Sequence, residues 1–258
     1  MKKAILVVSF GTTYKGTIEK TIGVCETKIS KKLKDYDLFR AFTSSIVIKK
    51  VKDRDGIHIE NPEEVLDGLY KKGYKEVIVQ PLYIIPGKEF DRLKSIIERY
   101  KNKFDKIIVG RPLLTDINDY KEIIRIIKKS VSKLPPKEAI VYMGHGTFHK
   151  SHSAYIVLES MLRELNTNAY IGTMEGNLNI YDIIEKLRKN NIQSITLAPF
   201  MLVAGKHVLN DMAGDNKNSW KSIFESEGFD VKIDLKGLGE NIYIQDKFMI
   251  HAYECVKN

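Results

Sequence analysis

The sequence predicts an α/β protein built from two similar halves, each a parallel sheet covered by helices. Apolar segments of strand length alternate with amphipathic segments of helix length, which is the pattern of βαβ units. The alternation begins again after Lys133-Leu-Pro-Pro-Lys137, the one segment whose composition suits a linker. Residues 77–89 also align without a gap to residues 195–207, and residues 5–12 resemble residues 140–147. These observations indicate an internal repeat.

The first half should contain four strands and several helices. Asn61-Pro62-Glu63-Glu64 is a helix start, with a capping Asn, a proline at the first helical position and acids in the first turn. Pro86-Gly87-Lys88 opens another helix. We expect strands at residues 3–9, 38–42, 76–82 and 106–109, and helices at residues 16–34, 61–73, from 86 onward and 117–132.

The second half repeats this order. We expect strands at residues 139–143, 168–173, 194–199 and 230–235, helices at residues 154–165 and 180–190 and near Trp220, and a loop around residues 205–207. A final amphipathic helix at about residues 243–256 should pack against the first half. The expected domains are therefore residues 1–132, residues 133–240 and the C-terminal helix within residues 241–258.

Composition excludes several classes of protein. The chain of 258 residues carries a formal charge of +9, which favours anionic partners. Its lysines are scattered over predicted helices without a basic stripe, so we expect neither nucleic acid nor membrane as a partner. With only Cys25 and Cys255, neither a disulfide scaffold nor a thiolate metal site is indicated. The N-terminal apolar run enters Gly11-Thr-Thr directly and reads as a core strand, so we expect a cytoplasmic protein.

Three of the six histidines fall within residues 142–152. His145 lies between Gly144 and Gly146 just after a predicted buried strand, where backbone would approach a neighbour closely. Ligands collect at the carboxyl ends of strands in open α/β sheets, so His145 should line a site; the alternative is a plain turn residue. For His149 and His152 we expect solvated side chains, with support of the site or proton relay as alternatives.

A candidate metal site follows from polar residues at three strand ends of the second half. These are His145, Glu175 and His207, which follow its first, second and third strands. Two imidazoles and a carboxylate suit a divalent ion such as Co, Fe, Ni or Zn, and three protein ligands leave coordination positions open. Taken singly, Glu175 could instead be a solvated or capping acid, and His207 a surface residue. In the internal repeat, Phe10 matches His145 and Glu89 matches His207.

At these residues the chain resembles a known family. Residues 4–13, 80–89, 144–147, 172–176, 205–207 and 237–240 together are similar to the anaerobic, class II sirohydrochlorin cobalt chelatases of cobalamin biosynthesis. The most specific segments are Met143-Gly-His-Gly-Thr147, Met174-Glu-Gly176 and Gly205-Lys-His207. The resemblance covers nearly the whole chain and implies a fold like that of ferrochelatase.

The resemblance implies ATP-independent insertion of Co²⁺ into sirohydrochlorin, with the metal bound by His145, Glu175 and His207 in a cleft between the halves. His145 is expected to act also as general base. No Walker-type phosphate loop occurs in the sequence, in agreement with a reaction that uses no ATP. We expect Phe10, Lys88, Glu89 and Lys206 to bind the substrate, whose many carboxylates suit a basic chain; Lys15 and Arg54 are further candidate cations.

Three alternatives remain open at this stage. Similar ligands would serve insertion of Ni²⁺ or Fe²⁺, because ligand type alone does not select cobalt. Paired α/β lobes also make non-catalytic carriers of tetrapyrroles or metals. A metal-dependent hydrolase could use the same three residues to activate water. The sequence does not indicate an oligomeric state.

Overall fold

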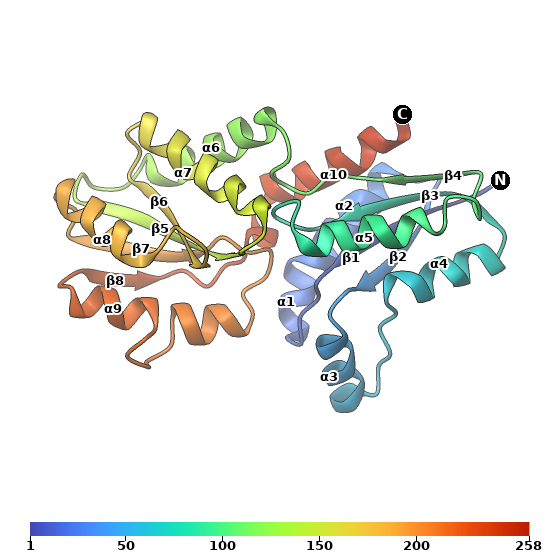
Figure 1. Ribbon diagram of the computed structural model, residues 1–258, viewed down its shortest axis with the longest axis horizontal. Helices are drawn as coiled ribbons and strands as arrows, with labels where there is room; N and C mark the ends of the chain where they lie inside the picture. The colour runs from blue at the N-terminus through green and yellow to red at the C-terminus, as the bar shows by residue number, and fades with distance from the viewer. Residues whose placement is uncertain (258) are drawn as a thin grey trace. The chain divides into compact units, whose positions relative to one another are not determined.

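Two parallel four-stranded sheets organise residues 1–257, the part of the chain that this computed structural model describes (Figure 1). One unit comprises residues 1–113 and the C-terminal segment from Gly239, and the other comprises Leu114–Leu238. The division differs from the predicted one. Helix α6 (Ile117–Val131), which the sequence placed in the first half, packs on α7 and β6 of the second unit.

The first unit has the strand order β2-β1-β3-β4, with all neighbours parallel. Its elements are β1 (Lys2–Ser9), α1 (Lys15–Lys20), α2 (Ile22–Lys32), β2 (Asp37–Phe42), α3 (Ser45–Asp55), α4 (Pro62–Lys71), β3 (Tyr74–Pro81), α5 (Lys88–Glu98), β4 (Lys106–Val109) and α10 (Ile242–Lys257). The four strands were all predicted, with ends that differ by a few residues.

Local chemistry explains where the helices of the first unit begin and end. Asn61 and Glu64 form the two halves of a capping box at the start of α4. Ser44 caps α3, which ends at Gly56 in the left-handed conformation. The single helix expected over residues 16–34 is instead broken at Thr21, whose hydroxyl donates a 2.5 Å hydrogen bond to the Thr17 carbonyl oxygen. Such a bond to the preceding turn bends or interrupts helices.

Helices cover both faces of the first sheet. Val65, Leu66 and Leu69 of α4 pack with Leu93, Ile96 and Ile97 of α5 on the alternating apolar residues of β1 and β3. On the other face α10 packs against α2 and β3, and contributes buried Phe248 and Ala252. The chain therefore returns to the first sheet after completing the second.

The second unit repeats the arrangement, with the strand order β6-β5-β7-β8 and parallel pairing throughout. Its elements are α6, β5 (Glu138–Gly146), the 3₁₀ turn η1 (Lys150–His152), α7 (Ser153–Glu164), β6 (Ala169–Glu175), α8 (Ile180–Lys189), β7 (Ser194–Pro199), the π-helical turn η2 (Val208–Met212), α9 (Trp220–Ser226) and β8 (Asp230–Ile233); a short 3₁₀ turn η3 (Leu238–Glu240) precedes α10. In both sheets the second strand of the unit lies outside the first, and the third and fourth follow on the other side. The equal order supports the internal repeat.

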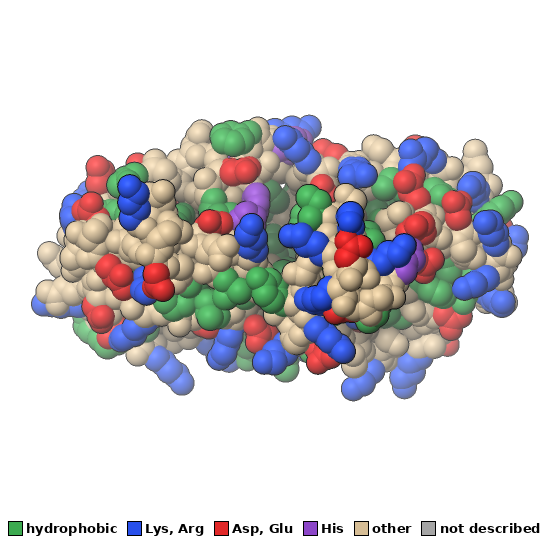
Figure 2. All heavy atoms as spheres, turned by 90° about the horizontal axis from the view of Figure 1, so that it is seen from below, with side chains coloured by type: hydrophobic (Ala, Val, Ile, Leu, Met, Phe, Trp, Pro, Cys, Tyr) green, Lys and Arg blue, Asp and Glu red, His purple; other side chains and the backbone are tan. Residues whose placement is uncertain are grey.

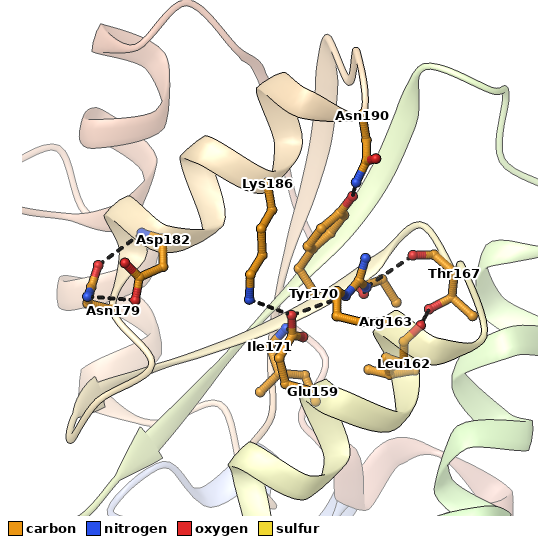
Figure 3. A network of polar contacts seen from close by, with 11 residues as sticks. Glu159, Leu162, Arg163, Thr167, Tyr170, Ile171, Asn179, Asp182, Lys186 and Asn190 are labelled. Carbon is orange, nitrogen blue, oxygen red and sulfur yellow. Dashed lines mark hydrogen bonds and ion pairs between the residues drawn. The ribbon is translucent and has the colours of Figure 1, made fainter.

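A buried ion-pair network ties three elements of the second unit together (Figure 3). Glu159 of α7 is 3% exposed, and its Oε1 lies 3.1 Å from Arg163 Nε and 3.0 Å from Lys186 Nζ of α8. Its Oε2 accepts a 2.9 Å hydrogen bond from the backbone N–H of Ile171 in β6. The network fixes α7 and α8 relative to β6, the strand that ends in Glu175.

Two strands of the second unit run further than the sequence indicated. β5 continues through His145 to Gly146, and β6 continues to Glu175, so both candidate residues lie within strands rather than in the loops after them. Within residues 1–257 no helix combines the length and the apolar composition that crossing a bilayer requires.

Candidate active site

The glycines on either side of His145 are positions of close backbone approach. A Cβ atom on Gly146 would lie 1.9 Å from the carbonyl oxygen of Glu175, and one on Gly144 would lie 2.7 Å from the Tyr155 ring. Gly146 has a φ of 75°, a conformation that residues with a Cβ rarely adopt. The predicted close approach is therefore confirmed, and it brings the ends of β5 and β6 together.

Tyr155 of α7 supports this strand end and was not recognised in the sequence. Burial raises the pKa of its hydroxyl to about 12, against the effect of a hydrogen bond from the backbone of Gly146. Its ring packs against Phe200 at 6.2 Å and against His152 at 5.9 Å between centroids. Tyr155 thus lies against the Gly-His-Gly segment, on the side where Gly144 has no side chain.

The structure brings His145 and His207 together. Their ring centroids lie 5.1 Å apart with an interplanar angle of 88°, and both side chains are exposed. His145 Nδ1 lies 3.2 Å from the carbonyl oxygen of Gly146, and His207 Nδ1 lies 2.7 Å from Asp211 Oδ2. An Nδ1–H that donates to an oxygen leaves the Nε2 lone pair free. Both rings can therefore present Nε2 to one ion.

Asp211 is a functional candidate that the sequence reasoning missed. It lies on the π-helical turn η2, four residues after His207, and not in the loop expected around residues 205–207. A carboxylate that accepts from the second nitrogen of a metal-binding histidine fixes its tautomer and raises its basicity. The available signal was the spacing His-x-x-x-Asp, which places two side chains on one face of a helical turn.

Glu175 is exposed at the end of β6, but its side chain does not join the two imidazoles. The strand register pairs it with Gly146, one residue beyond His145. Because successive side chains of a strand point to opposite faces, that register directs Glu175 and His145 to opposite sides of the sheet end. Accordingly, residues 1–257 contain no group of three His, Cys, Asp or Glu side chains placed to hold a metal ion.

His152 is buried, so the expectation of a solvated side chain was wrong for this residue. It is 7% exposed, and its Nε2 accepts a 3.1 Å hydrogen bond from the backbone N–H of Asn177. A Cβ atom on Gly176 would lie 2.4 Å from the same ring. Burial lowers the pKa of His152. The ring therefore supports the turn that directly follows Glu175.

His149 is half-buried and takes part in the turn before α7. Its Nδ1 accepts from the backbone N–H of Ser151 at 3.3 Å and lies 3.0 Å from the Ser151 hydroxyl. It caps η1 as an asparagine or aspartate would. Of the three clustered histidines, one faces His207, one supports the turn after Glu175 and one caps a helical turn.

Comparison with known proteins decides the family. A model of the cobalt chelatase (CbiK) family matches residues 3–257. The chain belongs to this family. It is therefore a metal chelatase, as the resemblance of its histidine and glycine segments implied.

Two curated relatives cover almost the whole of this chelatase. It is 39% identical over 256 residues to the sirohydrochlorin cobaltochelatase of Salmonella typhimurium, an alignment that covers 99% of this chain and 97% of that protein. It is 31% identical over 264 residues to the sirohydrochlorin cobaltochelatase CbiKC of Nitratidesulfovibrio vulgaris, with 99% and 91% covered.

Solved chelatase structures share the fold at low sequence identity. SirB from Bacillus subtilis with Fe³⁺ aligns with a TM-score of 0.66 at 16% identity, over 99% of this chain and 96% of that chain. CbiX, described as the terminal enzyme for biosynthesis of siroheme in denitrifying bacteria, aligns with a TM-score of 0.59 at 13% identity, over 99% and 98%. The predicted class II chelatase fold is therefore confirmed.

The remaining substrate-binding predictions for this chelatase fall on exposed or half-buried positions. Lys206 is exposed beside His207 in the second unit, and Phe10 is 53% exposed at the end of β1 in the first. Lys88 and Glu89 open α5, and Glu89 Oε2 is buried and has no hydrogen-bond partner among residues 1–257. Arg54 instead donates hydrogen bonds to its neighbour Asp55 and to the carbonyl oxygen of Thr13 in the loop after β1.

Proposed function

We propose that this chelatase inserts Co²⁺ into sirohydrochlorin without ATP, and that His145, Glu175 and His207 handle the ion. The proposal is carried by the perpendicular pair of exposed imidazoles at the carboxyl edge of the second sheet, 5.1 Å apart. Both curated relatives bear the name of this reaction, at 39% and 31% identity over nearly the full chain.

The two histidines supply the first contacts to the incoming ion. Imidazole nitrogens bind first-row divalent metals at about 2 Å, and two perpendicular rings at this spacing can direct their Nε2 atoms to one ion. Asp211 keeps the proton of His207 on Nδ1, and its negative charge makes Nε2 of the same ring a stronger ligand. Coordination positions left open can then exchange water for ring nitrogens of the tetrapyrrole.

Glu175 completes the ligand set in this proposal by a change of side-chain rotamer. It is exposed, and its backbone is anchored to Gly146 and its following turn to His152. Glu175 is the last residue of β6, so its side chain leaves from the opposite face but can extend past the strand end, after a rotamer change, toward the edge where the imidazoles lie. The anchored backbone keeps it within reach while the ion is exchanged.

Metal insertion also requires removal of two pyrrole protons. We assign this step to His145, one proton at a time, once the ion has moved from its Nε2 to the ring nitrogens of the substrate. Nε2 then accepts a pyrrole proton, passes it to solvent water at this exposed position and accepts the second, while Nδ1–H stays on the Gly146 carbonyl oxygen. His207, held by the Asp211 carboxylate, is the more persistent metal ligand. Lys206, next to it, can meet carboxylates of the substrate.

An anaerobic insertion assay tests this assignment. Sirohydrochlorin and Co²⁺ are mixed with wild-type protein, His145→Ala or His207→Ala, and the absorbance change of the macrocycle is followed. We expect each substitution to reduce the rate at least about 10²-fold, the usual scale for loss of a catalytic acid–base group. Near-normal rates in both variants would remove these residues from the mechanism.

His149→Asn is the matched control, because asparagine preserves the capping acceptor of η1 and changes a histidine of the same segment. Its rate should equal that of the wild type. Parallel assays with Ni²⁺ and Fe²⁺ measure metal preference. If sirohydrochlorin binds but no metal accelerates beyond buffer, the protein is a carrier and the proposal fails.

A further inference from the structure

A pocket of about 490 Å³ lies wholly within the first unit, where the starts of α3 and α4 meet α5. Thr43 and Ser45 line it at the start of α3, Asn61 and Pro62 at the start of α4, and Arg92 on α5. Figure 2 shows Lys and Arg side chains, with Asp and Glu side chains between them, on the surface where α3 lies. None of the residues assigned to metal insertion lines this pocket.

The acids of the lining are engaged by groups other than Lys52 and Arg92. Asp53 pairs with Lys49 at 2.7 Å, Glu63 pairs with Arg99, and Glu64 accepts from the backbone N–H of Asn61 at 2.7 Å. His58 Nε2 adds a 3.5 Å contact to Glu64.

Two cations of the lining, Lys52 and Arg92, are not paired with any of these acids. In the part of the chain that the structure describes, neither side chain has a carboxylate or hydrogen-bond partner. These two side chains are therefore the ones available to bind an anionic group.

The rest of the lining defines the shape of a suitable ligand. Ile48 and Ile96 provide apolar walls. Thr43 Oγ1 is a buried hydroxyl oxygen that faces the Tyr83 hydroxyl but makes no hydrogen bond of good geometry within the described part of the chain. Ser44 and Asn61 cap the two helix starts, so the free side chains must do the binding. A ligand with a charged group on a short aliphatic chain would fit both the polar side chains and the isoleucines of this lining.

We propose that this pocket binds a carboxylate carried on a short aliphatic arm. The guanidinium of Arg92 offers a planar fork that fits a carboxylate, Lys52 adds a second positive charge, and the isoleucines contact the methylene groups of the arm. The arm has two possible sources: an acid side chain of the tetrapyrrole, which rests on the proposed function, or a free small polycarboxylate.

The surroundings of the pocket favour the tetrapyrrole as the source. Ser44, which lies between the lining residues Thr43 and Ser45, donates its backbone N–H to the Phe10 carbonyl oxygen at 3.3 Å. Arg92 lies four residues after Lys88 on α5, so both leave the same face of that helix. The pocket therefore adjoins two of the positions expected to bind substrate.

Binding measurements on the metal-free, full-length protein test the proposal. The dissociation constants of sirohydrochlorin, by anaerobic absorbance titration, and of citrate, by calorimetry, are compared for wild type and the double variant Lys52→Gln/Arg92→Gln. The matched control, Lys50→Gln/Lys94→Gln, removes the same charge from the same two helices at positions outside the lining. Because all four side chains are exposed or at the surface, thermal melts should show both double variants folded.

We expect the pocket variant to bind sirohydrochlorin at least about tenfold more weakly, as for loss of charge-assisted hydrogen bonds, with the control within about twofold of wild type. If only citrate binding weakens, the pocket still binds a carboxylate and its source is a free acid. Unchanged affinity for both ligands, or an equal loss in the control, would overturn the proposal. If wild type binds no sirohydrochlorin, the proposed function fails, and the citrate comparison still decides the pocket.

Discussion

Asp211 determines which nitrogen of His207 is free, since its carboxylate lies 2.7 Å from Nδ1. We predict that Asp211→Asn raises the dissociation constant and the KM for Co²⁺ by about 10- to 100-fold, the range usual for partners that orient metal-binding histidines. The physical cause is loss of the negative charge that strengthens Nε2 as a ligand. Calorimetric titration with Co²⁺ and steady-state kinetics measure the two quantities.

Asp215→Asn serves as the control for this prediction, because Asp215 is exposed nearby and pairs with Lys221 at 2.8 Å. It should bind Co²⁺ like wild type. The affinity of Asp211→Asn for metal-free sirohydrochlorin should also stay unchanged. An unchanged affinity would show that the variant is folded and that only its binding of Co²⁺ is altered. Equal Co²⁺ affinity in Asp211→Asn and wild type would show that His207 acts without this carboxylate.

His152 gives the protein a pH-dependent stability. Burial lowers its pKa in the folded protein, whereas in the unfolded chain the pKa stays near 6.5. Below that pH the unfolded chain binds more protons than the folded one, so this histidine's contribution is complete above about pH 6.5 and is lost as the pH falls. The loss can reach about 1.4 kcal/mol per pH unit.

His152→Gln isolates this effect, because glutamine can still accept from the Asn177 N–H but does not titrate. We predict that the difference in unfolding free energy between wild type and His152→Gln decreases as the pH is lowered from about 7.5 to about 5.5. Urea denaturation at each pH measures it. A difference that does not change over this range would show that His152 takes up a proton without cost in the folded state.

At the scale of elements, Glu159 joins α7, α8 and β6 through one buried carboxylate. We predict that Glu159→Gln lowers the free energy of unfolding by about 3 kcal/mol, since it leaves Arg163 and Lys186 without their anionic partner. Glu159→Ala should cost more, because the Ile171 N–H then loses its acceptor as well. Glu164→Gln, exposed at the end of the same helix, should change stability by less than about 0.5 kcal/mol. Chemical denaturation compares the three variants.

Elements with strong local signals were predicted well from the sequence. The capping residues around Asn61 located α4, and apolar runs located every strand of both sheets. The break at Thr21 was not predicted, because it depends on one hydroxyl that bonds to the turn before it. The π-helical turn η2 was missed for a similar reason: its backbone pattern has no distinct signal in composition or periodicity.

For the site, spacing along the sequence predicted that strand ends carry the candidate residues, and the structure places His145 against His207. The spacing could not predict the register between β5 and β6, which pairs Glu175 with Gly146 and not with His145. A shift of one residue reverses the face of a side chain, and only pairing across the sheet fixes it. The support from Asp211 and Tyr155 likewise depends on contacts that no local pattern specifies.

At the scale of the whole molecule, two sheets with the same strand order carry different chemistry. Phe10 directly follows β1, whereas His145 lies in the equivalent strand β5, and Glu89 follows β3 where His207 follows β7. The repeat therefore preserves strand order and helix packing, while the imidazole pair is confined to the second unit. Folding requires the same strand order in both units, whereas only the second unit carries the pair His145 and His207.

The first unit is built from both ends of the chain, because the C-terminal helix α10 packs against α2 and β3. Phe248 of α10 is fully buried in that unit, and Phe224 of α9 is fully buried in the second. We predict that Phe248→Ala and Phe224→Ala each lower the free energy of unfolding by about 3 to 5 kcal/mol, through lost burial and the cavity left behind.

The two substitutions should differ in where protection from hydrogen exchange is lost. Because each unit has its own core, Phe248→Ala should accelerate exchange in β1, β3 and α2, and Phe224→Ala in β7, β8 and α8. Hydrogen exchange read by mass spectrometry on peptides from both units distinguishes the two patterns. If either variant accelerates exchange equally in both units, the chain opens as a single cooperative body, and α10 stabilises the unit that carries His145 and His207 as much as the one it packs against.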